Sequence, residues 1–199
     1  DYGQAGLFDA IVAGRRGITR AQEVFTGSIT TNILEHSRLI PVWIVDQSVT
    51  IHRILAAVDG SKNALRVVDH LSYILAGTSN MRVTLFHVNA KPKIDTGALA
   101  EESGPLKKIM TASSRSYIEA FFETAKERFA NFGFPLAHLE TKIAPSSLNI
   151  GKSITNEAKR GGYDTVVVGR SGEDRAFFMG SVSRYVIRKL SGCALWLVP

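Results

Sequence analysis

Two glycine-rich segments of this 199-residue sequence have the residue types and spacing that could hold a phosphate group. Each reads Gly-x-x-Gly and then, after a short interval, Gly-Ser. The residues are Gly14, Gly17, Gly27 and Ser28 in the first segment, and Gly169, Gly172, Gly180 and Ser181 in the second. Closely spaced glycines let backbone N–H groups converge on an anion, and a helix that begins at the serine adds unpaired N–H groups of its own. Both segments are therefore candidate phosphate sites; the alternative is that the glycines only turn the chain.

The two segments belong to an internal repeat of strand, glycine loop, helix and strand. An aspartate and an apolar strand precede each loop: Asp9 with residues 10–13, and Asp164 with residues 165–168. Each serine stands at the expected N-cap of a helical pattern. A tryptophan-containing strand then closes each copy, at residues 42–45 and 195–198.

The two copies differ inside the loop. Nine residues separate the second and third glycines of the first copy, and seven separate those of the second copy. The shorter loop also contains Glu173 and Asp174, whose carboxylates would oppose a phosphate, although Arg170 and Arg175 could offset them. The second loop is therefore a candidate site that has been altered where the phosphates would lie.

The region between the copies alternates strands and helices. An almost continuous apolar run over residues 53–58 is typical of a strand covered on both faces, and it ends in Asp59-Gly60-Ser61. The further predicted elements are helices at 61–77, 106–131 and 147–160, strands at 81–88 and 139–143, and a loop at 89–105. This order predicts an α/β fold with a doubly wound parallel five-stranded sheet. In such sheets ligands bind beyond the carboxyl ends of the strands, where we expect Asp59 and Gly169.

Three features of the sequence occur together: Val58-Asp59-Gly60-Ser61, His87-Val88 at the end of a strand, and the glycine signature of residues 14–28 followed by Pro41-Val42-Trp43-Ile44-Val45. With these features the chain resembles the universal stress protein family. The resemblance implies an adenine nucleotide α-hydrolase-like fold. It also implies a complete domain at residues 51–199 and, at residues 1–46, the C-terminal part of a first such domain, which is a partial β-α-β unit. The parent would be a tandem protein, and a start at Asp1 without methionine fits a truncated or processed product.

The resemblance also implies a ligand, which is ATP with or without Mg²⁺. Asp59 and Val88 would then lie on the adenosine side of the site. The phosphate side would be formed by Gly169, Gly172, Gly180, Ser181 and Ser183. In the incomplete copy, Gly14, Gly17, Gly27 and Ser28 would form half a site, whose missing surface either comes from a neighbouring chain or is absent.

The two tryptophan strands would each lie at an edge of a sheet, and exposed apolar edges tend to be paired. Because the last strands of two domains associate in the resembled family, we expect residues 42–45 to pair with residues 195–198. The pairing would occur within one chain or across a homodimer.

Composition argues against several classes of function. The net charge of +6 comes from 24 basic and 18 acidic residues that are scattered along the chain, so we expect no nucleic acid partner. No apolar run reaches 18 residues and no signal-peptide pattern is present, so we expect no membrane association and a cytoplasmic location. The histidines lack metal-ligand spacing, and the single cysteine, Cys193, is expected to pack as a small buried hydrophobe. No catalytic motif is recognisable, so we assign no catalytic residue and no metal ligand.

These observations predict a stress-response regulatory protein of the universal stress protein type that binds an adenine nucleotide. Two alternatives stay open. One is a dimerising stress protein that binds no nucleotide, and the other is a slow ATP hydrolase.

Overall fold

The structure of the chain is a computed structural model. It describes residues 8–15, 32–34, 36–37, 39–46, 50–90, 104–171 and 179–199, with side chains of the long helix α4 from residue 115 onward. Gly17, Gly27, Ser28 and Gly172 of the predicted site lie outside the described residues.

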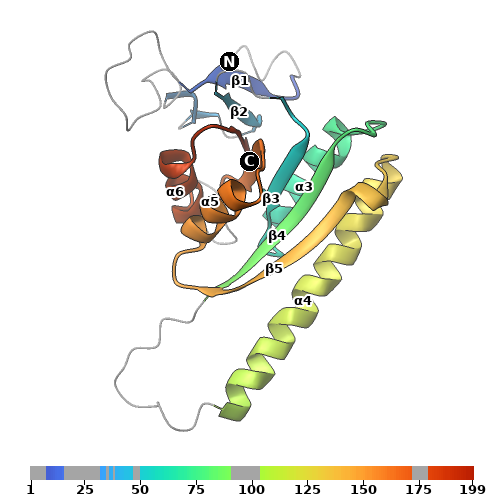
Figure 1. Cartoon of the computed structure of the whole chain (residues 1–199), viewed down its shortest axis with the longest axis vertical. Helices are drawn as coiled ribbons and strands as arrows, with labels where there is room; N and C mark the ends of the chain where they lie inside the picture. Colours follow the sequence, from blue (N-terminus) through green and yellow to red (C-terminus); the bar gives the residue numbers. More distant parts are fainter. Residues whose placement is uncertain are drawn as a thin grey trace.

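The predicted alternation of strands and helices from residue 51 is confirmed (Figure 1). The strands are β1 (Ile11–Gly14), β2 (Val42–Val45), β3 (Arg53–Ala57), β4 (Arg82–Ala90), β5 (Leu139–Ser147), β6 (Thr165–Gly169) and β7 (Ala194–Val198). The helices are α3 (Lys62–Ile74), α4 (Gly104–Asn131), the short 3-10 helix η1 (Leu136–His138), α5 (Ile150–Arg160) and α6 (Ser181–Lys189).

Two predicted helix starts were wrong. Helix α5 begins at Ile150 and not at Ser147, because Ser147 still pairs with Ala90 of β4 and Asn149 caps the helix by accepting the N–H of Lys152 at 2.8 Å. Helix α6 has Gly180 as its N-cap, so Ser181 is its first helical residue and does not cap it. Residues that can cap a helix stand at neighbouring positions, and the end of the preceding strand or loop selects among them.

The strands form one seven-stranded sheet in the order β1-β2-β7-β6-β3-β4-β5. The five strands from β3 to β7 are mutually parallel, with the first strand, β3, between β4 and β6. This is the predicted doubly wound arrangement. Strands β1 and β2 are parallel to each other and extend the sheet at one side.

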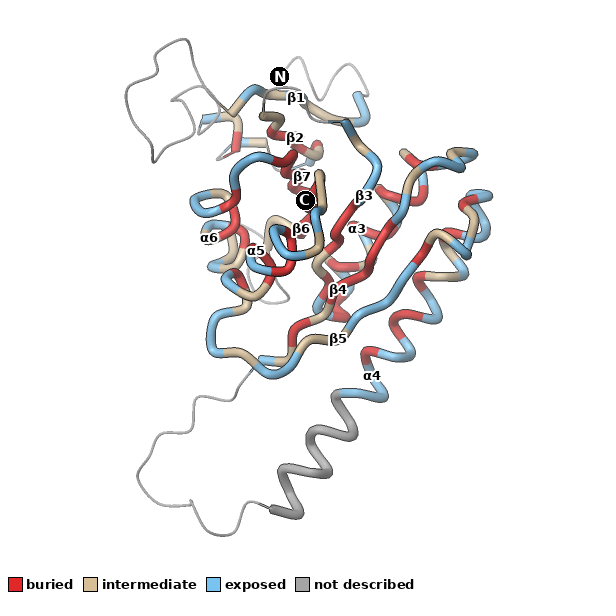
Figure 2. Tube along the Cα trace, in the orientation of Figure 1, coloured by how far each residue is buried: buried red, intermediate tan, exposed pale blue. Residues whose placement is uncertain are grey.

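Two hydrophobic clusters cover the two faces of the sheet. The α3/α4 cluster includes Val67, Leu71, Phe121, Phe129 and Trp196. The α5/α6 cluster includes Leu34, Ile154, Val186, Leu190 and Leu195. Successive residues of β3 point alternately into the two clusters, and Ile54, Leu55 and Ala56 are all fully buried, as expected for a central parallel strand (Figure 2).

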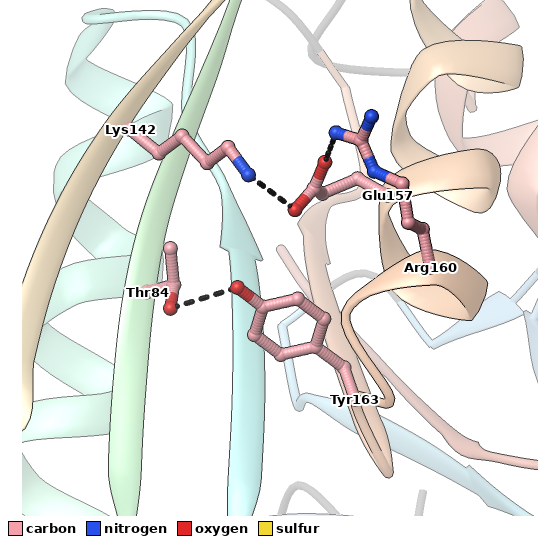
Figure 3. Close-up of polar contacts among 5 residues, drawn as sticks. All are labelled: Thr84, Lys142, Glu157, Arg160 and Tyr163. Carbon is pink, nitrogen blue, oxygen red and sulfur yellow. Dashed lines mark hydrogen bonds and ion pairs between the residues drawn. The ribbon is translucent and has the colours of Figure 1, made fainter.

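An ion pair on the buried carboxylate of Glu157 joins α5 to the edge strand β5 (Figure 3). The Glu157 carboxylate, only 5% exposed, accepts hydrogen bonds from Lys142 at 2.7 Å and from Arg160 at 2.6 Å. Burial acts to raise the pKa of Glu157, but these two cations outweigh it and hold the pKa below its usual value. Tyr163 donates to Thr84 nearby at 3.0 Å. These contacts lie on the sheet face and away from the carboxyl ends of the strands, so we interpret them as structural.

The predicted pairing of the two tryptophan strands is present within the single chain. Strand β2 pairs with β7 in antiparallel register, with Trp43 opposite Trp196. The two indole rings stack with centroids 4.0 Å apart and planes within 8°. The Nε1–H of Trp43 donates to Nε2 of His70 on α3 at 3.1 Å, so this histidine nitrogen must carry no proton.

The free energy of unfolding is expected to fall with pH below about 6.5 because of His70. Burial lowers the pKa of His70 to about 4, and the Asp9 carboxylate acts in the opposite direction. Between about pH 4 and pH 6.5, His70 binds a proton in the unfolded chain but not in the folded chain. One proton changes the free energy of unfolding by about 1.4 kcal/mol per pH unit. The slope here is smaller than this limit because the imidazole is partly exposed. Urea unfolding at pH 7 and pH 5 checks this, with H70Q expected to flatten the difference and H36Q, at an exposed site, expected to keep it. Equal pH dependence in H70Q and the unmodified chain would contradict the assignment.

Candidate functional site

The candidate site lies at the carboxyl edge of three neighbouring strands, β6, β3 and β4. Asp59 follows β3, Gly169 is the last residue of β6, and Val88 lies near the end of β4. The chain leaves β3 for helix α3 on one face of the sheet, and leaves β6 for α6 on the other face (Figure 1). This divergence is the topological switch point at which open α/β sheets bind ligands. The structure therefore brings together Asp59 and the base of the second glycine loop, as the sequence predicted.

The Asp59 turn is held in place by its own hydrogen bonds. The Asp59 carboxylate accepts the N–H of Ser61 at 3.0 Å, and the buried Ser61 hydroxyl accepts the N–H of Ala64 at 3.1 Å as the N-cap of α3. Asp59 itself is exposed. Its carboxylate is thus fixed in position and remains accessible from solvent.

Two side chains from other elements hold the same turn from outside. The Tyr117 hydroxyl on α4 donates to the carbonyl of Gly60 at 2.8 Å, and His87 on β4 donates from Nδ1 to the carbonyl of Val58 at 2.9 Å. Gly60 has a φ of 86°, and a Cβ there would lie 2.6 Å from Cε1 of Tyr117. Glycine is therefore required at this position both by the backbone conformation and by the neighbouring ring. His87 therefore has a structural role in holding this turn.

Tyr117 is a residue of this edge that the sequence did not predict. The signal was an aromatic residue directly before the apolar stripe of α4, which begins at Ile118. In the sequence, an aromatic residue at this position is interpreted as the margin of the hydrophobic face of the helix. Only the path of α4 past the carboxyl edge of β3 brings its hydroxyl to Gly60.

The base of the second glycine loop is closed by backbone and hydroxyl contacts. The N–H of Gly180 donates to the carbonyl of Arg170 at 2.9 Å. The Ser183 hydroxyl lies 2.8 Å from the carbonyl oxygen of Gly169 and 2.9 Å from that of Arg170, and Ser183 is 3% exposed. This hydroxyl points into the protein, whereas Ser181, at the start of α6, is exposed.

Arg170 contacts the N-terminal segment. Its guanidinium donates to the backbone carbonyl of Ser37, and Arg170 and Ser37 line a small cavity together with Leu34, Val42, Met179, Leu197 and Pro199. Arg15, the corresponding residue of the first copy, donates to the carbonyl of Ile187 in α6 at 3.2 Å and forms an ion pair with Asp46 at 3.3 Å. Each arginine therefore contacts the other copy of the repeat: Arg15 contacts α6, and Arg170 contacts Ser37.

Gly14, the first glycine of the first segment, does not lie at this site. Gly14 ends β1, and because β2 runs antiparallel to β7, the carboxyl end of β1 lies at the opposite edge of the sheet from Asp59 and Gly169. Gly14 and Gly169, the first glycines of the two motifs, consequently lie at opposite ends of the sheet.

The side chain of Val88 is 6% exposed and belongs to the α5/α6 cluster. A ligand at this edge would meet its backbone more readily than its isopropyl group. Cys193 is buried as predicted, and burial raises the pKa of its thiol to about 11, so the thiolate is scarce at neutral pH.

The family model described as the universal stress protein family matches residues 50–199. The chain belongs to the universal stress protein family. No curated protein sequence matches it.

Solved structures of other universal stress proteins share this fold. A universal stress protein-type chain from Pseudomonas aeruginosa UCBPP-PA14 is 15% identical, with a TM-score of 0.65 over 99% of this chain and 65% of its own. Universal stress protein UspA from Lactobacillus plantarum is 18% identical, with a TM-score of 0.62 over 76% of this chain and 100% of its own. A universal stress protein solved in complex with cAMP is 19% identical, with a TM-score of 0.50 over 74% of this chain and 96% of its own.

The chain thus spans about two thirds of the length of the P. aeruginosa relative. The shorter L. plantarum relative is covered over its whole length by a part of this chain. Among the described helices, none is long and apolar enough to cross a lipid bilayer.

Proposed function

We propose that this universal stress protein is a regulatory binding module that takes an adenine nucleotide, ATP first, at the carboxyl edge of β3, β4 and β6. The observation that carries the proposal is the juxtaposition of the fixed, exposed Asp59 carboxylate with the Gly169 loop base on adjacent strands. The solved relative that holds cAMP, itself an adenine nucleotide, supports this ligand class.

Each part of the edge has a chemical role in this proposal. A carboxylate accepts hydrogen bonds at both oxygens, so Asp59 can hold the N–H of Ser61 and a ribose hydroxyl together. The glycine loop and the first N–H groups of α6 provide donors for the phosphates. Ser183, which is buried, positions the loop by bonding its base and does not contact the phosphates directly.

We further propose that residues 51–199 form one complete domain and that residues 1–46 are the C-terminal part of a first one. The matching strand registers of β1 with β2 and of β6 with β7 support this division. The protein would act as a paired unit within one chain or as a homodimer of such units.

ATP at 1 mM is expected to raise the melting temperature by roughly 5 to 10 °C. A dissociation constant of about 10 μM would stabilise the fold by roughly 2.7 kcal/mol at that concentration. The variant D59N keeps an oxygen for the N–H of Ser61 but loses the charge and one acceptor, so it should show a clearly smaller shift. E127A, which removes an exposed carboxylate on α4, is the matched control and should behave like the unmodified chain.

Differential scanning fluorimetry with and without ATP and Mg²⁺ makes this measurement. Absence of any shift in the unmodified chain at millimolar ATP would favour the first alternative, a stress protein without nucleotide. Release of inorganic phosphate at saturating ATP would favour the second, a slow hydrolase.

A further inference from the structure

Helix α6 runs between the two edges of the sheet. Its N-terminus follows Gly180 beside the base of the second glycine loop, and its C-terminus leads through Gly192 into β7. The helix has nine residues, which corresponds to about 13 Å of helix length. A displacement of one end therefore moves the other end, because a short helix behaves as one rigid element.

Few residues of α6 enter the core. Among its nine residues only Ser183 and Val186 are buried, whereas the eleven-residue helix α5 buries five. In its middle α6 packs on α5, where Gly151 leaves room for the side chain of Tyr185 (Figure 1). The contacts at the two ends of α6 therefore help to fix its position.

The C-terminal end of α6 is held by two side chains of the first copy of the repeat. The Arg15 guanidinium donates to the carbonyl of Ile187 at 3.2 Å, and the Asp46 carboxylate accepts the N–H of Gly192 at 3.2 Å. Carbonyls in the last turn of a helix have no partner within the helix, and the helix dipole favours a cation there. Arg15 therefore stabilises this end of α6 both as a donor and as a charge.

Arg15 and Asp46 are also paired with each other. Nε of Arg15 lies 3.3 Å from Oδ2 of Asp46, and the two side chains are only 12% and 7% exposed. Breaking a buried ion pair by removing one partner is costly, because the other charge stays buried. The pair thus fixes the direction in which each side chain reaches α6 and the turn that follows it.

The first copy also contacts the other end of α6. Arg170, at the base of the second glycine loop, donates from its guanidinium to the carbonyl of Ser37. The carbonyl of Arg170 in turn accepts the Ser183 hydroxyl at 2.9 Å and the N–H of Gly180 at 2.9 Å. These bonds join the first turn of α6 to the loop base. The first copy therefore contacts α6, or the loop base bonded to it, at both ends.

We propose that Arg15, with Asp46 as its partner, is a positioning residue for the phosphate side of the candidate nucleotide site and acts through α6. Arg15 follows the strand end that lies at the opposite edge of the sheet, so it does not line the site itself. By holding the C-terminal end of α6, it sets where the first N–H groups of that helix stand. Those groups are the donors proposed for the phosphates. Asp59, on the adenosine side, follows β3 and is not bonded to α6. This inference rests on the proposed function.

The first measurement uses the full chain without nucleotide. Amide hydrogen exchange in R15M is expected to rise by a larger factor at the N–H groups of Gly180 and Leu190, at the two ends of α6, than in strand β4. These N–H groups donate to Arg170 and Val186. The double variant R15M/D46N removes both charges of the pair together and should show the same pattern. R115M, which removes an exposed arginine paired with Glu119 on α4, is the matched control and should leave α6 unchanged.

The second measurement compares two ligands by isothermal titration calorimetry. In R15M the affinity for ATP is expected to fall about ten-fold, whereas that for adenosine, which carries no phosphate, should change by less than about two-fold. R15K keeps a cation near the end of α6 and should recover part of the ATP affinity. A general loss of folded protein would weaken both ligands by the same factor.

The experiment separates this inference from the proposed function. If the unmodified chain binds neither ATP nor adenosine, the proposed function fails, and hydrogen exchange alone then decides whether Arg15 positions α6. The positioning role is overturned if exchange at Gly180 in R15M and in R15M/D46N rises no more than in β4. It is also overturned if R15M weakens ATP and adenosine equally.

Discussion

Replacing Ile44 by proline is expected to lower the free energy of unfolding by about 3 kcal/mol or more. Strand β2 lies between β1 and β7, so both of its edges are paired, and the side chain of Ile44 is 0% exposed. Proline removes a ladder N–H and restricts the preceding residue, Trp43, which stacks on Trp196. For a chain of this size the loss corresponds to a fall in melting temperature of roughly 6 to 12 °C.

The measurement is urea unfolding followed by tryptophan fluorescence, with near-ultraviolet circular dichroism to report the stacked indoles. The control is I44V, which keeps the N–H and removes one methylene, at a cost of about 0.5–1.5 kcal/mol. An unchanged unfolding midpoint together with an unchanged indole signal in I44P would show that the antiparallel pair does not hold the two copies together.

Grafting the first glycine loop in place of the second is expected to strengthen ATP binding by ten-fold or more. The graft replaces Gly172 to Gly180 with the sequence of Gly17 to Gly27, which restores the nine-residue interval and removes Glu173 and Asp174. Both loops start from the same geometry, since Arg15 N–H donates to Val45 and Arg170 N–H donates to Val198. Each added charge-assisted hydrogen bond could contribute about 1.5 to 3 kcal/mol.

Isothermal titration calorimetry with ATP compares the graft with the unmodified chain. A second variant, E173Q with D174N, keeps the seven-residue interval and separates the effect of charge from that of length. If a folded graft binds ATP no more tightly than the unmodified chain, the shortened loop is not what limits the site.

The arginines of the two glycine motifs illustrate how position in the sheet changes a residue's role. Arg170 stands where the sequence suggested a charge that could offset the carboxylates of Glu173 and Asp174. In the structure its guanidinium donates to Ser37, just as Arg15 donates to Ile187 of α6. Both arginines follow the last residue of a strand that pairs with a tryptophan strand, β1 with β2 and β6 with β7. Each guanidinium is within reach of the opposite copy. They therefore join the two copies of the repeat.

The sequence by itself determined the local elements and the edge at which the candidate site lies. The apolar run of β3 was long enough to require burial on both faces, and the alternation of strands with helices requires parallel pairing with right-handed crossovers. Asp59 and Gly169 each follow a strand, and the carboxyl ends of parallel strands meet at one edge of the sheet. The exposed apolar edges expected for the two tryptophan strands, together with the family resemblance, also predicted the pairing of β2 with β7.

Only the tertiary structure decided which side chains complete that edge and which leave it. Tyr117 reaches Gly60 because α4 crosses the end of β3, and no spacing within one helix encodes that crossing. Ser183 turns inward and Gly14 lies at the opposite edge, because the fold of the loop and the antiparallel β2–β7 pair set their directions. Local sequence patterns indicate the periodicity of a helix or strand and where it begins and ends. Contacts between residues far apart in the chain depend on how whole elements pack, and that information is distributed over the entire core.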